Sequence, residues 1–278
     1  MVKRKKITIT LREDLLSRID KLIDKSKIRT RSHAIEYILD QSLTPKISKA
    51  LILAGGKGIK VEGMKDQLPK SMLPIKGKPL LEYQIQLLKE AQITDVLILV
   101  GHLGEKIKYY FGDGRWLGVK ITYLEQKKKN IGTAFALSLA KKFLENDPFL
   151  VMYGDTLLQI DLKDFIDFHF SSKTLATIAL TSIKEPTLYG VVKLRGEKIV
   201  DFIEKPKEEE VSRVISAGVF AFEPEIFNFL PPKPSANLEE KVFPTLAKRG
   251  MLSGYLFEGK WFDVGTQEAY EKVLKEWD

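Results

Sequence analysis

Hydrophobic and polar positions divide the chain into two regions with different periods. From residue 49 onward, short unbroken apolar runs alternate with segments in which apolar residues recur every three or four positions. The unbroken runs are typical of buried strands, and the periodic segments of amphipathic helices. Strands that are buried on both faces and separated by helices form a parallel sheet. The pattern therefore predicts an α/β fold, with helices on both faces of the sheet.

The same pattern gives the boundaries of the elements. Strands are predicted from Leu51 and over Asp95–Val100, Val119–Leu124 and Pro148–Met152, and helices over Pro79–Ala91, Leu103–Phe111 and Gly132–Phe143. A glycine-rich segment, Gln126 and Asp155 each come just after one of these strands. Because ligands of such sheets bind beyond the carboxyl ends of the strands, we expect these residues to converge on one edge.

The first 43 residues follow a different pattern. Strict alternation from Lys5 to Leu11 predicts a half-buried strand. Its apolar side holds Ile7, Ile9 and Leu11, and its polar side holds Lys6, Thr8 and Thr10. Two short amphipathic helices follow, one opening with Glu13 and Asp14 and the second with Thr30 as its N-cap.

A strand and two helices of this size cannot bury enough apolar surface alone. Two copies can, if their strands pair into an antiparallel ribbon over four helices. We therefore predict a small dimerising domain at residues 1–43, a linker at 44–48 that is broken by Pro45, and a large domain at 49–278.

The amino-acid composition excludes several classes of functional site. The chain of 278 residues has 44% hydrophobic residues, no cysteine and three histidines, which excludes disulfides, thiolate metal sites and a cysteine nucleophile. No apolar run approaches the roughly 18 residues of a membrane span, so we expect a soluble, cytoplasmic protein. The net charge is +8, and residues 1–43 carry eleven Lys or Arg against six Asp or Glu. This excess is typical of a nucleic-acid-binding appendage.

The glycine-rich segment runs from Leu51 through Gly55, Gly56 and Gly58 to Pro74. Glycines allow backbone N–H groups to approach a phosphate chain closely, although no G-K-[ST] of a Walker A loop follows them. With Lys60 and Lys70, the segment resembles the G-G-x-G-T-R-L and P-K-P-M-L-P signature of the sugar-1-phosphate nucleotidyltransferases. The run of residues 79–278 is most similar to the mannose-1-phosphate guanylyltransferases among them.

This resemblance implies a mixed, mostly parallel, Rossmann-like nucleotidyltransferase fold and a set of site residues. Lys60 and Lys70 would be catalytic, and Mg²⁺ would be held by Asp155 and Asp263, since this ion favours one or two carboxylates plus phosphate oxygens. The nucleotide would contact Leu53, Ala54, Gly55, Gly56, Gly58, Gln126, Gly132 and Thr133. The sugar phosphate would contact Tyr189, Gly190, Glu204, Lys205, Gly218 and Glu239.

The implied reaction is a displacement at phosphorus. An oxygen of the sugar 1-phosphate attacks the α-phosphorus of a nucleoside triphosphate, and pyrophosphate leaves. The protein must align two anions and neutralise the charge that grows on the leaving group.

Residues 3–43 resemble the ribbon-helix-helix repressors. In that family the outward ribbon residues enter the major groove of double-stranded DNA, which here implies Lys6, Thr8 and Thr10. The start of the second helix, here Arg31 and Ser32, would hold the DNA backbone. Lysine and threonine have the donors and acceptors that such contacts require. A basic dimerisation arm without an operator is the alternative interpretation.

Some positions depart from the nucleotidyltransferase signature. The loop Thr-Arg is replaced by Ile59-Lys60, its later Pro and Thr by Gly63 and Lys65, and the Asn before Ala-Gly by Ser216. Lysine keeps the positive charge but loses the planar fork of arginine. Two functions therefore stay open: an active enzyme tethered to DNA, and a transcriptional regulator that senses a nucleotide or nucleotide sugar without efficient catalysis.

Overall fold

The computed structural model describes residues 6–24, 26–43, 46–56, 58–59, 61–62, 67–127, 131–207 and 212–277, with the side chains of residues 40–43 excepted. Residue contacts divide the chain into two compact units, Met1–Pro45 and Lys46–Asp278. Among the described residues, no helix combines the length and the apolar character that crossing a bilayer requires.

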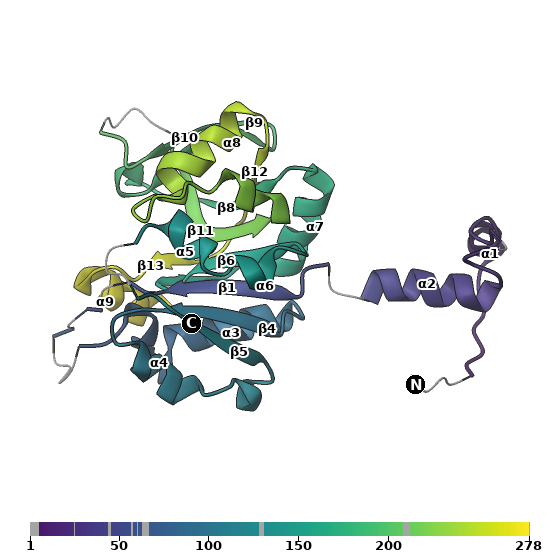
Figure 1. Ribbon diagram of the computed structural model, residues 1–278, viewed down its shortest axis with the longest axis horizontal. Coiled ribbons are helices and arrows are strands. Elements are labelled where there is room, and N and C mark those ends of the chain that lie inside the picture. The colour runs from purple at the N-terminus through teal and green to yellow at the C-terminus, as the bar shows by residue number, and fades with distance from the viewer. Residues whose placement is uncertain are drawn as a thin grey trace. The chain divides into compact units, whose positions relative to one another are not determined.

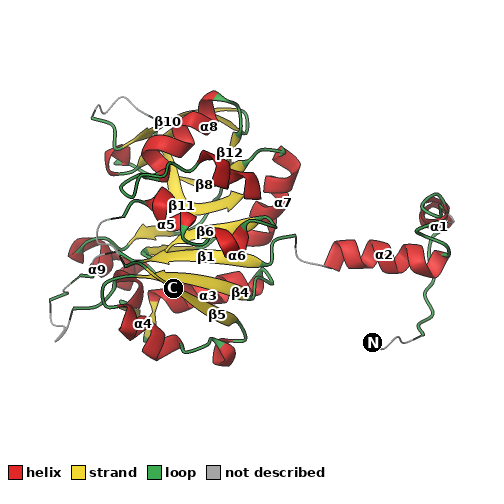
Figure 2. Ribbon diagram, viewed as in Figure 1, coloured by secondary structure: helices red, strands yellow, loops and turns green. Residues whose placement is uncertain are grey.

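The second unit is built on one large sheet (Figures 1 and 2). Its strand order is β5-β4-β1-β6-β11-β8-β12-β10-β9. The strands are β1 (Lys49–Ala54), β4 (Asp95–Val100), β5 (Lys120–Glu125), β6 (Phe149–Tyr153), β8 (Ala176–Ser182), β9 (Gly190–Arg195), β10 (Lys198–Glu204), β11 (Val214–Phe222) and β12 (Leu252–Leu256). Two small ladders lie beside it, β7 (Thr156–Leu158) with β13 (Trp261–Asp263) and β2 (Pro74–Ile75) with β3 (Lys78–Pro79).

The expected mixed sheet is confirmed, but parallel pairing dominates only one half of it. β5, β4, β1 and β6 run parallel to one another. β11 is antiparallel to both β6 and β8, and β10 is antiparallel to β12 and β9. The carboxyl ends of the four parallel strands therefore share one edge, where the predicted nucleotide residues follow them.

Helices cover both faces of the sheet. The helices of this unit are α3 (Leu80–Glu90), α4 (Gly104–Phe111), α5 (Thr133–Ser138), α6 (Lys141–Leu144), α7 (Leu162–Ser172), α8 (Phe243–Lys248) and α9 (Gln267–Glu276). Alternate residues of β1 enter different cores, with Ala50 and Ile52 packing in the core of α3, α4 and α7, and Leu51 in the core of α5, α6 and α8. This two-sided burial explains the unbroken apolar run in the sequence.

Most predicted boundaries agree with the structure, and one helix differs. The strand Asp95–Val100 has the predicted limits. The helix expected over Gly132–Phe143 is instead split into α5 and α6. At the break, the Leu139 N–H is shared between the carbonyls of Phe135 and Ala136, and the Ala140 N–H bonds the carbonyl of Leu137. Such tightening to 3₁₀-type bonds ends the α-helical ladder without a glycine or proline.

A third apolar cluster lies under the β7–β13 ladder. It joins Leu73 and Ile75 to Phe262, Val264 and the inner face of α9. The cluster anchors the segment that carries Asp263 against the segment that follows the glycine loop.

The first unit contains α1 (Glu13–Asp20) and α2 (Arg31–Leu43). The predicted N-cap is confirmed, since the Thr30 hydroxyl accepts a hydrogen bond from the His33 N–H at 3.2 Å. The strand expected from Lys5 to Leu11 is not formed, because residues 6–12 have no regular secondary structure in the single chain. The predicted strand needs the strand of a second chain as its hydrogen-bonding partner, and a single chain does not supply one.

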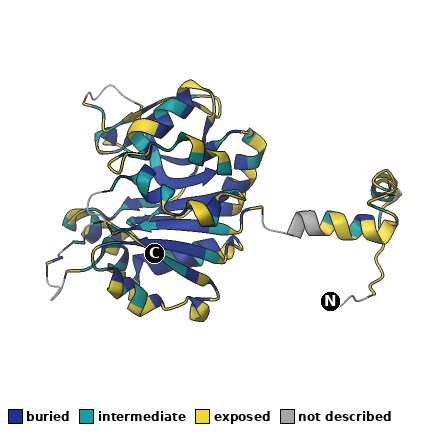
Figure 3. Cartoon of the chain, viewed as in Figure 1, coloured by how far each residue is buried: buried dark blue, intermediate teal, exposed yellow. Residues whose placement is uncertain are grey.

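Burial separates the two units clearly (Figure 3). The strands of the large sheet are buried, whereas most side chains of the first unit are exposed, with Ile7 at 70% and Ile9 at 48%. Within the first unit, Ile19 and Ala34 are its buried apolar residues among those described.

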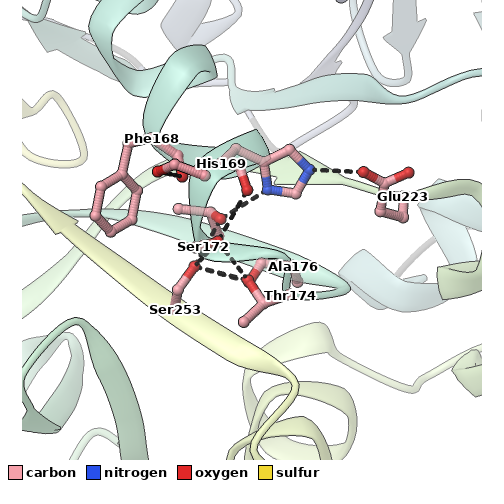
Figure 4. A network of polar contacts seen from close by, with 9 residues as sticks. Phe168, His169, Ser172, Thr174, Ala176, Glu223 and Ser253 are labelled. Carbon is pink, nitrogen blue, oxygen red and sulfur yellow. Dashed lines mark hydrogen bonds and ion pairs between the residues drawn. The ribbon is translucent and has the colours of Figure 1, made fainter.

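A buried polar network joins α7 to β8 and β12 (Figure 4). The His169 Nδ1 lies 2.7 Å from the Thr177 hydroxyl, which lies 2.7 Å from the Ser253 hydroxyl. The His169 Nε2 lies 3.4 Å from a carboxylate oxygen of Glu223. Burial lowers the pKa of His169 to about 4, so the ring is neutral in the folded protein near pH 7.

Candidate functional site

The edge formed by the carboxyl ends of β1, β4 and β5 brings together two predicted nucleotide residues. Gly55 follows β1, and an added side-chain carbon there would overlap the Gln126 amide and lie 3.7 Å from the Gly101 nitrogen. The Gln126 N–H donates to the Val100 carbonyl at 2.9 Å, which fixes the start of its segment. A side chain at Gly55 would therefore displace the Gln126 side chain, whereas the expected approach of this loop to a phosphate chain stays a prediction.

The glycine loop folds back on the segment that leads to Lys70. Ile59 and Leu68 exchange backbone hydrogen bonds of 2.9 and 3.2 Å. A side chain at Gly58 would meet the Leu68 carbonyl. Lys60, the other predicted catalytic lysine, lies outside the described residues together with Gly63 and Lys65.

The two predicted metal ligands come together from distant parts of the chain. Asp155 lies just beyond β6, and Asp263 ends β13, where it pairs with Thr156 of β7. The backbone N–H of Val264 donates to the Asp155 carbonyl at 2.8 Å, so the two acids are held on neighbouring backbone segments. The Lys70 Nζ donates to Asp155 Oδ2 at 3.1 Å.

Electrostatics confirms that these charges are close enough to interact. Burial, followed by the negative charge of Asp155, raises the pKa of Asp263 to about 6, while Lys70 and Lys205 lower it. The two carboxylates therefore repel each other when both are ionised.

A cavity of about 170 Å³ opens next to the two acids. Every residue predicted to contact the sugar phosphate lines it, and so do both predicted metal ligands. The lining residues are Tyr153, Asp155, Thr156, Leu188, Tyr189, Gly190, Glu204, Lys205, Ser216, Gly218, Glu239, Trp261 and Asp263. A second, smaller cavity of about 50 Å³ lies on the glycine-loop side and is lined by Leu53, Ala54, Gly56, Lys70, Ser71, Gly154 and Asp155. Asp155 lines both cavities.

Glu239 is a half-buried residue of the larger cavity, and both of its carboxylate oxygens accept hydrogen bonds. The Thr133 hydroxyl donates to its Oε2 at 2.7 Å, and the Tyr153 hydroxyl donates to its Oε1. Burial raises the pKa of Glu239. A carboxyl group in this setting is a specific hydrogen-bonding partner for a hydroxyl-bearing ligand.

Thr133 and Gly132 were predicted to contact the nucleotide, but their described contacts are internal. The Thr133 hydroxyl accepts from the Leu238 N–H at 2.8 Å while it donates to Glu239. A side chain at Gly132 would overlap the Ala236 carbonyl. These two residues therefore support the start of the short helical segment Leu238–Val242, which carries Glu239, a role that the sequence did not indicate.

Backbone geometry shapes the wall that carries Lys205. Lys205 has a positive φ of 47°, which is unusual for a residue with a side chain, and its N–H donates to the Tyr189 carbonyl at 3.1 Å. The Tyr189 ring meets the edge of Trp261, with 5.1 Å between ring centroids, and the Trp261 indole N–H donates to the Ala217 carbonyl at 3.0 Å. Gly218 also has a positive φ, of 77°.

Gln84 is a buried residue that the sequence analysis missed. Its amide Nε2 donates to the carbonyls of Tyr153 and Thr156, at 2.7 and 2.6 Å, which flank the turn that carries Asp155. A signal was present, since Gln84 lies on the apolar stripe of α3 together with Leu81, Ile85 and Leu88. A polar residue on a buried stripe needs internal partners.

The predicted DNA-binding residues lie in the first unit and are exposed. Lys6, Thr8 and Thr10 are in the segment without regular structure, and Ser32 is in the first turn of α2. The guanidinium of Arg31 is engaged by both oxygens of Asp20, at 2.7 and 2.8 Å.

The described acidic and histidine side chains limit the kinds of metal site that are possible. Within the described part of the chain, no group of three or more His, Cys, Asp or Glu side chains is arranged to hold a metal ion. A pair of acids suits Mg²⁺, which takes its other ligands from phosphates and water.

A larger cavity of about 590 Å³ lies between α3 and residues 158–163, and none of the predicted site residues lines it.

Comparison with known proteins links this geometry to a family. The family described as "Nucleotidyl transferase" matches residues 49–277. A UTP–glucose-1-phosphate uridylyltransferase of Synechocystis is 32% identical over 242 residues, and the match covers 82% of this chain and 62% of that protein. A mannose-1-phosphate guanylyltransferase catalytic subunit beta of Danio rerio is 32% identical over 227 residues, which are 80% of this chain and 62% of that protein. The chain thus spans about three fifths of the length of these curated relatives.

Solved structures agree with the fold. A Bacillus anthracis protein crystallised with sucrose is 30% identical and superposes with a TM-score of 0.73, covering 82% of this chain and 94% of that one. A UDP-glucose pyrophosphorylase crystallised with UDP-glucose is 25% identical with a TM-score of 0.71, covering 82% of this chain and 97% of that one. These similarities support the α/β architecture that the sequence predicted.

Proposed function

Because the chain belongs to the nucleotidyl transferase family, we propose that residues 49–277 transfer a nucleotidyl group from a nucleoside triphosphate to a sugar 1-phosphate. The observation that carries this proposal is the cavity of about 170 Å³. It gathers all of the residues predicted for the sugar phosphate around the acid pair Asp155 and Asp263. The smaller cavity at the glycine loop is also lined by Asp155 and gives the nucleotide phosphates a place.

In the proposed reaction, a non-bridging oxygen of the sugar phosphate forms a bond to the α-phosphorus. The bond between the α-phosphorus and the oxygen that bridges it to the β-phosphorus breaks, and pyrophosphate leaves with the electron pair of that bond. The attacking oxygen carries no proton near neutral pH, since the second pKa of a phosphate monoester is about 6. The site therefore needs no general base, and its task is alignment and charge neutralisation.

Charged side chains would divide this task. Lys70, with Lys60 of the glycine loop, would neutralise the triphosphate and the departing pyrophosphate. Lys205 would face the sugar phosphate, and Glu239 would hydrogen-bond sugar hydroxyls from its half-buried position. Gln126, beside the glycine loop, would read the edge of the base.

The acid pair fits a divalent cation. Burial and then the charge of Asp155 raise the pKa of Asp263, and a cation between the two carboxylates would relieve the repulsion between them. Mg²⁺ held there would neutralise charge shared between the nucleotide and the sugar phosphate.

Pyrophosphate release tests the proposal. The purified chain is incubated with Mg²⁺, each common nucleoside triphosphate and a panel of sugar 1-phosphates, and one pair is expected to release pyrophosphate. Asp155→Asn should abolish pyrophosphate release while the protein stays folded. Asp161 is the exposed N-cap of α7, so Asp161→Asn should lower stability somewhat but should leave pyrophosphate release unchanged. Binding of a nucleotide sugar without turnover across the panel would favour the sensor interpretation over the enzyme.

We also propose that the first unit is a dimerising, DNA-binding domain. The supporting observation is its uncovered apolar surface. Ile7 and Ile9 are 70% and 48% exposed, and Leu22, Tyr37 and Leu39 of the same unit are also exposed. A second copy would bury this surface and would give the strand of residues 5–11 its partner. Sedimentation equilibrium should show a dimer for the full chain and a monomer for the double variant Ile7→Lys, Ile9→Lys.

A further inference from the structure

Ser71 has a buried hydroxyl group that nothing described in the protein satisfies. The residue lies in the short 3₁₀ turn Lys70–Met72 and is 3% exposed. Its Oγ has no hydrogen-bond partner among the described residues. A buried hydroxyl without a partner is unfavourable, so native proteins rarely keep one unless a ligand or an ordered water completes it.

The surroundings of Ser71 indicate which ligand that is. Ser71 lines the cavity of about 50 Å³, with the backbone of Gly56 and Gly154 on other walls and the charged groups of Lys70 and Asp155 beside it. A phosphate oxygen fits a site between a glycine loop and the positive charge of Lys70.

Two other buried polar atoms have no hydrogen-bond partner in the described part of the chain, and they differ from Ser71. The Oε1 of Gln84 belongs to an amide whose nitrogen already makes two hydrogen bonds. The Nε2 of His169 faces the Glu223 carboxylate at 3.4 Å. Neither residue lines the cavity at the glycine loop. Ser71 therefore combines a buried hydroxyl that lacks a partner among the described residues with a position among the residues that line the proposed phosphate site.

We propose that the Ser71 hydroxyl donates a hydrogen bond to a phosphate oxygen of the bound nucleoside triphosphate. The proposal rests on the function proposed above. The position is occupied by proline in the P-K-P signature that the segment resembles, and proline offers no side-chain donor. Serine adds a directional donor next to Lys70, in a chain whose glycine loop carries Lys60 in place of the signature's arginine.

Ser71→Ala in the full chain gives two readouts of opposite sign. Without ligand, its thermal midpoint should rise by about 2 °C or more, because an unsatisfied buried hydroxyl is removed. With Mg²⁺ and the preferred triphosphate, its calorimetric affinity should fall about 10-fold, because the phosphate loses a donor. Ser71→Cys, with a weaker donor of similar size, should bind with intermediate affinity.

Controls separate this role from general effects on the fold. Ser171→Ala removes an exposed hydroxyl that donates to the Phe168 carbonyl at 2.8 Å, and it should change neither the nucleotide affinity nor the midpoint by a comparable amount. Affinity for the sugar 1-phosphate alone should be unchanged in Ser71→Ala, which identifies the nucleotide as the source of the phosphate oxygen.

Three results would overturn the proposal. Equal triphosphate affinity of wild type and Ser71→Ala would show that the hydroxyl meets only water. A lower midpoint of the ligand-free variant would show that the hydroxyl has a structural partner. A wild-type chain that binds no nucleoside triphosphate would refute the proposed function itself, and this outcome is distinct because it appears before any variant is compared.

Discussion

Lys70 and Asp155 form an ion pair, with the lysine Nζ 3.1 Å from a carboxylate oxygen, and Asp155 lines both cavities. Both side chains keep about a third of their surface exposed, at 30% and 32%. Lys70, which is proposed to bind phosphate, therefore pairs with Asp155, which is proposed to bind the metal ion. A divalent cation that used Oδ2 of Asp155 would compete with the Lys70 ammonium for that oxygen.

Replacing Lys70 should consequently have opposite effects on turnover and on metal binding. In Lys70→Met, pyrophosphate release should fall at least about 100-fold, because a charge that faces the transition state is lost. The affinity of the nucleotide-free protein for Mn²⁺, measured by electron paramagnetic resonance, should rise, because Asp155 no longer has a competing cation. Lys70→Arg keeps the charge and should retain the wild-type Mn²⁺ affinity more closely. Unchanged turnover in Lys70→Met would contradict the role given to this lysine.

The sequence predicted those parts of the molecule that depend on local pattern. The run Asp95–Val100 is apolar on both faces, and it forms a strand with those limits because both faces of the sheet are covered. The glycine loop could be located from the run of Gly55, Gly56 and Gly58 after an apolar strand, and the structure shows that a side chain at Gly58 would overlap the Leu68 carbonyl. Ordered motifs likewise placed the residues that now line one cavity, such as Glu204 and Glu239.

Contacts between distant segments could not be predicted in the same way. The sequence places Thr133 and Glu239 more than a hundred positions apart, and only the folded chain shows that the threonine hydroxyl binds the carboxylate. Residues 6–12 alternate as a strand does, yet a strand also needs a neighbour, and one chain does not supply it. The break between α5 and α6 contains no glycine or proline that would have signalled it.

Gln84 should act as a positioning residue for Asp155. In Gln84→Met, which keeps the shape of the side chain, the carbonyls of Tyr153 and Thr156 lose their common donor. The free energy of unfolding should fall by about 1–3 kcal/mol. Turnover should fall through kcat more than through KM, since the turn that carries Asp155 loses its support. The control Gln86→Met, on the same helix and bonded only to Glu82 among described groups, should shift stability by less than about 0.5 kcal/mol.

His169 should make stability depend on pH below neutrality. Its pKa is about 4 in the folded protein and 6.5 ordinarily, so between these values the unfolded chain binds a proton that the folded chain does not. Stability from this residue is complete above about pH 6.5 and is lost as pH falls toward 4, by about 3 kcal/mol in total. Glu223, whose pKa is raised by burial and by Glu225, faces the ring and would soften this loss if it stays ionised.

Urea unfolding between pH 4 and 8 checks this dependence against His169→Gln, which cannot titrate. Asp263 acts in the opposite direction in the same range, because its raised pKa of about 6 lets the folded chain gain a proton as pH falls. The difference between wild type and variant at each pH cancels that effect. The wild type should lose more stability than His169→Gln between pH 6.5 and 4, and parallel curves would show that the ring is accessible to protons in the folded state.

DNA recognition by the first unit should depend on Thr8 and Thr10 for sequence and on Arg31 for affinity. The ribbon formed by the two strands of a dimer would present these threonines from both chains in two-fold symmetry, which calls for a roughly palindromic site. Selection from random duplexes should enrich such a site with wild type, and with Thr8→Ala, Thr10→Ala it should enrich none while dimerisation and weak general binding persist. If wild type also enriches no sequence and its affinity collapses in moderate salt, the unit serves assembly alone.

The ion pair between Arg31 and Asp20 sharpens the affinity part of this prediction. Because Asp20 holds two N–H donors of the guanidinium, phosphate binding has to use the remaining donors or break the pair. Arg31→Ala should weaken binding to all duplexes and reduce the slope of log affinity against log salt by about one unit, as expected for one lost phosphate contact. Asp20→Asn keeps the arginine but removes its competing charge, so it should strengthen binding to all duplexes. If Asp20→Asn instead weakens binding as much as Arg31→Ala does, the pair matters for folding of the unit and Arg31 does not contact DNA.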